Sequence, residues 1–236
     1  MCLQVMQASV RIGSQDILAG ITVDFRRGER VAVVGANGAG KSTFLRLLAG
    51  AIQPSNGEID RGDPSETNVA LVWQGLALVQ RLSVLENVLI GAVARCRSPG
   101  TWWRIFPVVE VRRANTLLER LGIAHLAEER VDRLSGGERQ RAAIGRALMQ
   151  TADFLVADEP TASLDWSAAR DVARLFSGLA LSEGITTIAA VHDVSLLEHI
   201  CDRVIGLARG RIAFDLPRKA VGYKELAAIF PNSALA

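Results

Sequence analysis

The residues with the clearest chemical purpose form a glycine-rich stretch that ends in a lysine and a serine. Residues 35–42 read Gly-Ala-Asn-Gly-Ala-Gly-Lys-Ser, which matches the pattern G-x-x-x-x-G-K-[ST]. Glycines let backbone N–H groups converge on phosphate oxygens, and a following helix N-terminus adds partial positive charge. Lys41 is expected to reach the β- and γ-phosphates of a nucleotide, and Ser42 to bind Mg²⁺ through its hydroxyl. A turn that merely caps a helix requires neither side chain.

Two carboxylates, Asp158 and Glu159, directly follow the apolar run 154–157. Paired acids at the end of a buried strand rarely serve the structure alone, and they suit phosphoryl transfer. Asp158 is predicted to hold the Mg²⁺ shell, and Glu159 to orient or deprotonate the attacking water. Together with the glycine-rich stretch, they predict a nucleoside triphosphatase.

A third stretch, residues 134–138, reads Leu-Ser-Gly-Gly-Glu and opens a predicted helix over 138–149. A serine and flexible glycines at a helix N-terminus expose backbone amides, which can hold an anion. Taken alone, the stretch also fits an ordinary helix cap, so these residues leave both interpretations open.

The elements that must position these stretches alternate between strands and helices. Short apolar runs rich in β-branched residues predict buried strands at 31–34, 154–157 and 186–191. Helical spacing predicts one helix over 42–49 and another around 172–179. A parallel sheet with crossover helices follows from this alternation.

Other regions flank or interrupt this core. The first thirty residues alternate in polarity, as Ile17, Ile21, Val23 and Phe25 show, and they predict an antiparallel edge sheet. Residues 204–214 predict a hairpin with a glycine turn, followed by a helical tail over the last twenty residues. Between 82 and 149 helical patterns dominate, at 84–94, 111–121 and 138–149, without a strand pattern.

These patterns predict one α/β domain over residues 1–236. We expect a P-loop NTPase (RecA-like) core with an antiparallel β edge sheet and an inserted α-helical subdomain. The predicted core comprises residues 1–81 and 150–216, the helical subdomain residues 82–149, and the C-terminal tail residues 217–236.

Composition narrows the class of protein further. A net charge of +2 with scattered basic residues does not favour a nucleic-acid partner. Three widely spaced cysteines lack metal-ligand spacing and indicate reduced intracellular thiols. No apolar run reaches the roughly 18 to 20 residues that span a bilayer, so we expect any membrane role to depend on a partner.

In their order and spacing, six elements resemble the ABC ATPase family across nearly the whole chain. They are the phosphate loop 35–42, Gln74, the signature stretch 134–138, the acidic strand 154–159, Ser163-Leu164-Asp165, and His192 after a strand. The resemblance implies ATP binding and hydrolysis with Mg²⁺. It also implies a head-to-tail homodimer that buries two ATP molecules between its subunits.

The resemblance further implies residue roles. Gln74 would touch Mg²⁺ or the attacking water from the loop between the subdomains, and His192 would bind the γ-phosphate. Ser135 and Gly137 would bind the γ-phosphate held by the other subunit, and Asp165 would lie in the loop that crosses the dimer interface. Taken singly, His192 also fits a core histidine, Gln74 a surface amide and Asp165 a helix N-cap.

The predicted site residues fall into three sets. The catalytic set is Glu159, His192, Lys41 and Gln74. The metal set is Ser42, Gln74 and Asp158. The ATP-binding set is Gly35, Ala36, Asn37, Gly38, Ala39, Gly40, Lys41, Ser42, Thr43, Arg11, Ser135, Gly137 and Asp165.

Three positions depart from the family pattern. The signature stretch ends in Glu138 where the family usually has glutamine, which adds negative charge near a phosphate site. The family often stacks adenine on an aromatic residue, whereas the corresponding stretch offers Arg11 and Ile12. We expect the adenine to lie on the Arg11 guanidinium. Gly75 follows Gln74 and gives a more flexible hinge.

Finer features look like the phosphonate importer ATPases, namely residues 81–91, the aromatic segment 102–106, and residues 204–207 with 212–215. This resemblance implies a peripheral ATPase at the cytoplasmic face of the inner membrane that serves a separate permease and, indirectly, a solute-binding protein. Phosphonate or a related phosphorus oxyanion would be the solute. The alternatives are mechanical work on a lipoprotein-release or division-type complex, and ATP binding without turnover. The aromatic segment would either meet the permease or pack within the helical subdomain.

Overall fold

A six-stranded sheet forms the centre of the fold, with the strand order β5-β6-β7-β3-β8-β9. The computed structural model describes residues 2–62, 68–96, 105–162 and 164–230. Neighbouring strands are parallel except β8 and β9, which form an antiparallel hairpin. The strands are β3 (Arg30–Val34), β5 (Val69–Val72), β6 (Phe154–Asp158), β7 (Thr186–Ala190), β8 (Arg203–Ala208) and β9 (Arg211–Pro217). The predicted parallel sheet and hairpin are therefore confirmed.

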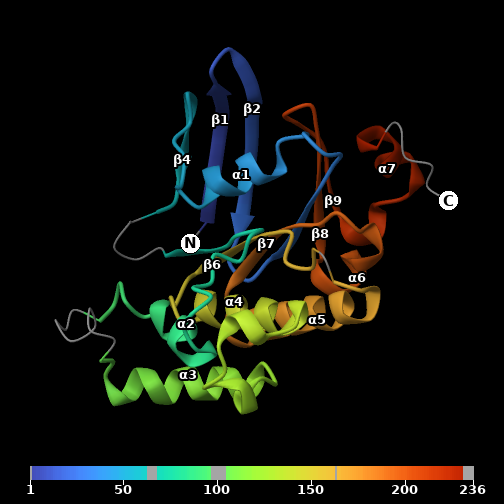
Figure 1. Cartoon of the computed structure of the whole chain (residues 1–236). Coiled ribbons are helices and arrows are strands. Elements are labelled where there is room, and N and C mark those ends of the chain that lie inside the picture. The colour runs from blue at the N-terminus through green and yellow to red at the C-terminus, as the bar shows by residue number, and fades with distance from the viewer. Residues whose placement is uncertain (1, 63–67, 97–104, 163, 231–236) are drawn as a thin grey trace.

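A three-stranded antiparallel sheet, in the order β2-β1-β4, stands beside the central sheet (Figure 1). Its strands are β1 (Cys2–Ile12), β2 (Gln15–Arg26) and β4 (Asn56–Asp60). Buried side chains of β1 and β2 share one hydrophobic core with α1 (Lys41–Leu48) and one face of the central sheet. The predicted edge sheet is confirmed, although β4 was not predicted because its residues do not alternate in polarity.

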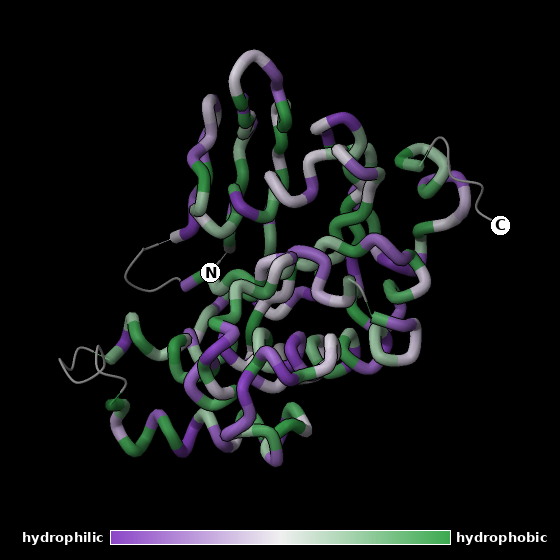
Figure 2. The backbone as a smooth tube through the Cα atoms, in the orientation of Figure 1, coloured by the Kyte–Doolittle hydropathy of each residue, from purple (hydrophilic) through white to green (hydrophobic). Residues whose placement is uncertain are grey.

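Helices cover the other face of the central sheet (Figure 1). Of these, α4 (Gly136–Leu148), α5 (Trp166–Ser182) and α6 (Leu197–Ile200) contact its strands. The helices α2 (Val84–Ile90) and α3 (Val108–Arg120) pack on α4, and α7 (Tyr223–Ile229) lies beside β8 and β9. Their buried side chains form a second core with those of β5, β6 and β7. Figure 2 shows hydrophobic residues along the central strands, between these two cores. Burial on both faces explains why the central strands read as continuous apolar runs.

The helices α2, α3 and α4 follow one another between β5 and β6. In the described part of this segment, the only extended pairing is a single bridge between Ser83 and Arg130. Gly145 of α4 permits close packing, because a Cβ there would lie 2.9 Å from Leu121 and 3.1 Å from Val88. The three helices thus form one packed unit, which also touches the core where α4 meets β5.

The C-terminal tail is helical only in part. The hairpin strand β9 continues to Pro217, which is the first residue of the predicted tail. A short helical turn, Arg218–Ala220, precedes α7. Glu225 fixes the start of α7, because its carboxylate accepts a hydrogen bond from the Gly222 amide at 2.9 Å. Ile229 of α7 is buried, which docks the helix against the core.

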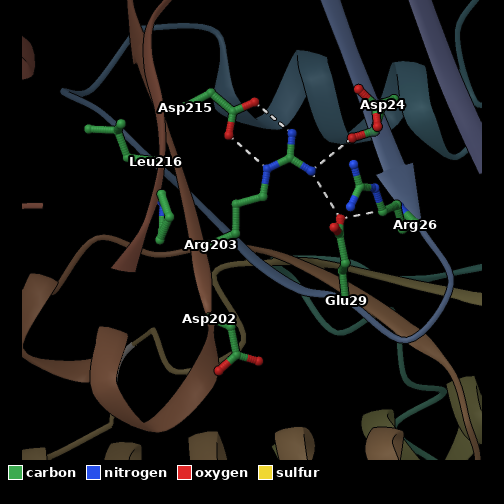
Figure 3. A pocket seen from close by; sticks show the side chains of 8 residues that line it. Asp24, Arg26, Glu29, Asp202, Arg203, Asp215 and Leu216 are labelled. Atoms are coloured by element: carbon green, nitrogen blue, oxygen red, sulfur yellow. Dashed lines mark hydrogen bonds and ion pairs between the residues drawn. The ribbon is translucent and has the colours of Figure 1, made fainter. Parts of the chain in front are cut away.

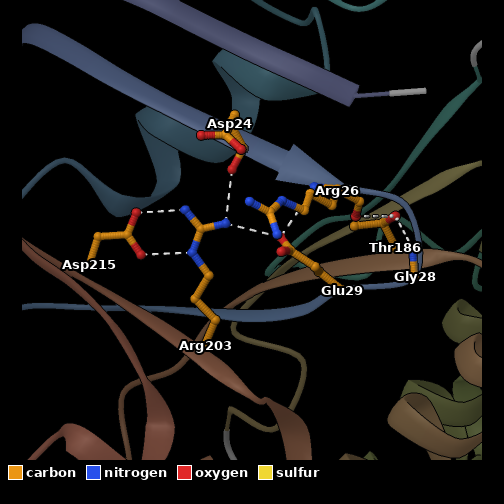
Figure 4. Close-up of polar contacts among 7 residues, drawn as sticks. All are labelled: Asp24, Arg26, Gly28, Glu29, Thr186, Arg203 and Asp215. Atoms are coloured by element: carbon orange, nitrogen blue, oxygen red, sulfur yellow. Dashed lines mark hydrogen bonds and ion pairs between the residues drawn. The ribbon is translucent and has the colours of Figure 1, made fainter.

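One arginine, Arg203 of β8, links the two sheets (Figure 3; Figure 4). It donates Nε and Nη2 to the Asp215 carboxylate at 2.7 and 2.6 Å. Its Nη1 donates to the Asp24 carbonyl and to the Glu29 carboxylate, both at 2.9 Å. The hydrogen bond to Asp215 is the main reason why the pKa of Arg203 is raised. A cavity of about 430 Å³ lies beside this guanidinium, and Glu29 and Asp215, which pair with Arg203, are among the residues that line it.

Candidate functional site

The phosphate loop joins β3 to α1 and is enclosed by backbone from two other segments. A Cβ at Gly35 would lie 2.3 Å from the Leu207 carbonyl oxygen, and one at Gly40 would lie 2.8 Å from the Leu18 side chain. From the β8–β9 turn, the Gly210 amide donates to the Ala39 carbonyl at 3.1 Å. These contacts restrict the backbone conformation of the phosphate loop, which lies between β2 and the hairpin turn.

Lys41 lies inside the phosphate loop with only 6% of its surface exposed. Its Nζ donates to the Gly35 carbonyl at 2.8 Å and to the Ala36 carbonyl at 3.3 Å. Burial lowers the pKa of Lys41, and the nearby charges of Glu159 and Asp158 partly offset this effect. The ammonium group is thus partly desolvated and held by neutral carbonyls, which a phosphate group would outcompete.

The two predicted Mg²⁺ ligands outside the Gln74 loop lie together. Ser42 donates its hydroxyl to Asp158 Oδ1 at 3.0 Å, and Asp158 is 3% exposed. The described residues hold no cluster of three or more His, Cys, Asp or Glu side chains suited to a metal. A hydroxyl and a carboxylate fit Mg²⁺, which takes oxygen ligands and completes its shell with phosphate and water.

Glu159 and Gln74 are 85 positions apart in the sequence but are in contact in the fold. The exposed Gln74 amide donates to Glu159 Oε2 at 3.1 Å. They meet because β5 and β6 are neighbours in register, with Val72 paired to Ala157. Glu159 has a left-handed backbone with φ 52°. Such a conformation costs on the order of 1–3 kcal/mol and is typical of functional sites.

His192 lies at the same edge of the central sheet as Glu159, where the parallel strands end. Both line a cavity of about 410 Å³ at the ends of β6 and β7, which pair in parallel up to Asp158 and Ala190. His192 is exposed, which excludes the interpretation as a core histidine. Glu159 is half-buried and His192 is exposed, so both side chains are accessible from solvent.

The signature stretch begins α4 with a capping box. Ser135 is the N-cap, and its hydroxyl and amide both donate to the Glu138 carboxylate at 2.8 Å. The side-chain hydrogen bond from Ser135 is the largest cause that lowers the pKa of Glu138. The unusual glutamate therefore binds the very hydroxyl that is expected to contact phosphate, and an incoming ATP would have to displace this carboxylate.

The glycines of the signature stretch differ in their surroundings. A Cβ at Gly136 would lie 3.1 Å from a methyl of Leu164. A Cβ at Gly137 would meet no described atom within 4 Å. The signature stretch thus touches the segment before Asp165 at one glycine, while Gly137 faces open space.

Asp165 is the N-cap of α5, as one of its two interpretations predicted. Its Oδ1 accepts a hydrogen bond from the Ala168 amide at 3.0 Å. Ser163, the first residue of the Ser-Leu-Asp segment, lies outside the described residues. So do Trp102, Trp103 and Arg104 of the aromatic segment.

Arg11 is not brought to the phosphate loop. Its guanidinium donates to both carboxylate oxygens of Asp16, at 2.6 and 3.2 Å. It lines a separate cavity of about 550 Å³ together with Ser55. Ile12, the neighbouring residue, is 60% exposed. These hydrogen bonds use the edge of the Arg11 guanidinium and leave its planar face free, so the stacking of adenine on Arg11 stays a prediction.

Trp166 is a site residue that sequence analysis did not identify. It lines the cavity of Glu159 and His192 and is 53% exposed. Its Nε1 donates to Ser195 Oγ at 3.3 Å, and the Arg170 guanidinium lies 4.7 Å from its ring centroid. Its position directly after Asp165 was the available sequence signal. Trp166 ties the start of α5 to the segment after His192.

Comparisons with known proteins agree with this geometry. A family model described as ABC transporter matches residues 18–162. The chain is 40% identical over 232 residues to the phosphonates import ATP-binding protein PhnC 1 of Natronomonas pharaonis, covering 98% of this chain and 100% of that protein. It is 38% identical over 215 residues to the phosphonates import ATP-binding protein PhnC of Wolinella succinogenes, covering 86% of this chain and 78% of that protein.

The fold is also found among solved structures. The structure of cbiO1 from Clostridium perfringens, part of the ABC transporter complex cbiONQ, has a TM-score of 0.80 at 30% identity and covers 97% of this chain and 93% of that chain. No helix among the described residues is long and apolar enough to cross a membrane. The chain therefore belongs to the ABC transporter family, as an ATP-binding cassette that hydrolyses ATP to drive transport.

Proposed function

We propose that this ATPase energises import of a phosphonate or a related phosphorus oxyanion through a separate membrane permease. The observation that carries the proposal is the similarity to a phosphonate import ATP-binding protein over 98% of this chain and the whole of that protein. In this proposal the subunit is peripheral at the cytoplasmic face of the inner membrane. Its partners are a second copy of the chain, permease subunits and, indirectly, a solute-binding protein.

The geometry supports a division of labour within the site. Lys41 exchanges the loop carbonyls for β- and γ-phosphate oxygens, and backbone amides of residues 36–43 surround the phosphates. Ser42 and Asp158 hold Mg²⁺, which supplies positive charge against the developing charge of the phosphoryl group. Glu159 orients or deprotonates the attacking water, while His192 binds the γ-phosphate.

Gln74 connects this chemistry to the rest of the transporter. Its amide already contacts Glu159, so a displacement of its loop would change the position of the carboxylate or of the water that it holds. We propose that Gln74 also approaches Mg²⁺ when nucleotide is bound. A small displacement suffices, because misplacement by about 1 Å can cost a factor of about 100 in rate.

The second half of each site comes from a second subunit in this proposal. Ser135 and Gly137 would bind the γ-phosphate of the partner's ATP, and Asp165 would lie at the interface. The exposure of Ser135 and the open space around Gly137 support this assignment, since both are accessible from outside the subunit. Contact with phosphate would require Ser135 to exchange its bond to Glu138 for one to the nucleotide.

Glu159→Gln tests the chemistry. We expect kcat to fall by about 10²- to 10⁴-fold, because general base catalysis typically contributes this much. ATP binding should persist, so size-exclusion chromatography with ATP should show a stable dimer. Glu183→Gln makes the same change at a surface residue paired with Arg120 and serves as the matched control. Normal turnover of Glu159→Gln would refute the role of the carboxylate.

The solute is tested in the assembled complex. The chain is purified with its native permease, placed in liposomes, and its ATPase rate is measured with solute-binding proteins loaded with phosphonate or with a control ligand. Stimulation by the phosphonate-loaded protein alone supports the proposal. Steady hydrolysis that ignores every binding protein contradicts it and favours the mechanical class of ABC ATPase.

A further inference from the structure

The segment that follows Gln74 is held by an arginine from α4. Arg146 donates Nη1 to the Ala77 carbonyl and Nη2 to the Leu76 carbonyl, both at 2.6 Å. These are charge-assisted hydrogen bonds, which are roughly twice as strong as neutral ones. Arg146 is half-buried, and burial lowers its pKa, yet a guanidinium keeps its charge in proteins.

The two residues that Arg146 binds have an unfavourable backbone. Leu76 and Ala77 both lie in the left-handed region, with φ 57° and 49°. This conformation costs roughly 1–2 kcal/mol for each residue that is not glycine. The local turn contributes two hydrogen bonds, from the Leu76 amide to the Trp73 carbonyl at 2.8 Å and from the Ala77 amide to the Gly75 carbonyl at 2.6 Å. The loop shape therefore depends on a restraint from outside, and Arg146 provides it.

The other end of the loop is fixed to the phosphate-loop helix. The Arg46 guanidinium of α1 lies 5.7 Å from the Trp73 ring centroid. Between the two attachments stands Gly75, whose Cβ position meets no described atom within 4 Å. Gln74 thus lies between an anchor on the core helix α1 and an anchor on α4, next to a glycine with free space around it.

The helix α4 connects this restraint to the signature stretch. It begins directly after Ser135 and carries Arg146 in its last turn. Its 13 residues extend over about 20 Å. Because an α-helix is rigid over this length, a displacement of Ser135 by a bound phosphate also moves Arg146 and the carbonyls that it holds.

We propose that Arg146 is a positioning residue for hydrolysis, which sets the Gln74 amide against Glu159 and transmits displacement of the signature helix to it. The inference rests on the proposed role of Gln74. Arg146 touches neither nucleotide nor water in this mechanism. Its effect therefore passes entirely through the loop, which separates it from a residue that binds ATP.

A double-mutant cycle in the ATPase assay of the full chain tests this. Gln74→Ala, Arg146→Ala and the double variant are compared at saturating Mg-ATP. We expect Arg146→Ala to lower kcat by about 10- to 100-fold, as for a misplaced group, while KM for ATP changes by less than about twofold. The double variant should be no slower than Gln74→Ala, because both changes remove the same contribution.

Arg141→Ala is the matched control on the same helix. Arg141 also donates to a backbone carbonyl, that of Leu121 at 2.8 Å, but it does not touch the loop. Any loss of kcat in Arg141→Ala should multiply with the loss from Gln74→Ala when the two substitutions are combined. Arg146→Lys keeps the charge and a donor, so it should restore part of kcat.

Hydrogen exchange gives a second readout that does not need turnover. In Arg146→Ala the amides of residues 74–78 should exchange faster, while those of residues 36–48 stay unchanged. If the fold losses in kcat from Arg146→Ala and Gln74→Ala multiply in the double variant, the inference is overturned while the role of Gln74 stands. The same holds if Arg146→Ala leaves the hydrogen exchange of residues 74–78 unchanged. If Gln74→Ala alone leaves kcat unchanged, the proposed role of Gln74 fails, and the inference with it.

Discussion

The phosphate loop and the Gln74 loop, residues 73–77, serve one site but are built in opposite ways. Around Gly35 there is no room for a methyl group, because the Leu207 carbonyl would lie 2.3 Å away. Around Gly75 the described atoms leave the same position empty to 4 Å. Backbone packing shapes the first loop, whereas long arginine side chains hold the second. The phosphate loop is thus preformed, whereas the Gln74 loop is adjustable.

The largest expected effect comes from adding a methyl group to the preformed loop. Gly35→Ala places Cβ against backbone, which cannot move without shifting β8. We expect a loss of about 1–3 kcal/mol or more in the free energy of unfolding, as for overpacking. ATP affinity should also fall by more than tenfold. Denaturant titration and equilibrium ATP binding measure the two effects.

The same methyl group in the adjustable loop should cost little. Gly75→Ala is expected to change the free energy of unfolding by within about 0.5 kcal/mol, as for surface substitutions. ATP affinity should be unchanged. If Gly75→Ala proved as damaging as Gly35→Ala in these assays, the two loops would not differ in the way described.

An intermediate effect is expected at the start of α4. Glu138→Ala removes half of the capping box, which should cost about 1 kcal/mol at neutral pH. The pKa of Glu138 is lowered below its ordinary 4.5 in the folded state. Its contribution is therefore complete above pH 4.5 and is lost as the pH falls through the folded value.

The measurement is the difference in Tm between the wild type and Glu138→Ala at several pH values. This difference should be constant above pH 4.5 and should shrink below it. A difference that instead grew on acidification would show that the ionised carboxylate does not stabilise this end of the helix. Glu225→Ala, which removes the similar cap of α7 far from the signature stretch, is a suitable control.

An effect of the opposite sign is expected from relieving strain in the adjustable loop. Ala77→Gly removes only a methyl group at a residue with φ 49°. The gain of roughly 1–2 kcal/mol from lost strain is offset in part by the greater freedom of glycine in the unfolded chain, about 0.5–1 kcal/mol. Tm should rise slightly. A fall in Tm would mean that Arg146 does not hold this residue against its own preference.

From the sequence one can predict the site residues whose side-chain type is itself required by the chemistry. Lys41, Ser42, Asp158 and Glu159 were predicted because phosphate and Mg²⁺ demand these side chains at set spacings, and the structure brings Ser42 and Asp158 into contact. Sequence gave no indication of the Arg146 contacts, since their acceptors are backbone carbonyls some 70 positions away. Carbonyl oxygens are common to every residue, so no pattern marks them.

The fold shows a similar division. Buried strands such as Phe154–Asp158 have continuous apolar runs and were predicted. The polar strand Asn56–Asp60 was not, because its place in the sheet depends on pairing with β1. The ion pair of Arg11 with Asp16 was not predicted either, because the bulged register of the hairpin sets Asp16 opposite Arg11. Register and long-range pairing depend on the whole fold, which local patterns do not contain.

The bond from Arg203 to the Asp24 carbonyl has a consequence for synthesis on the ribosome. The two residues are separated by 179 positions, and the Gly210 turn that supports the phosphate loop is made later still. Translation proceeds at about 5–20 residues per second, so Arg203 is made roughly 9 to 36 s after Asp24. The nascent chain therefore cannot complete the support of its phosphate loop until residue 210 has been made.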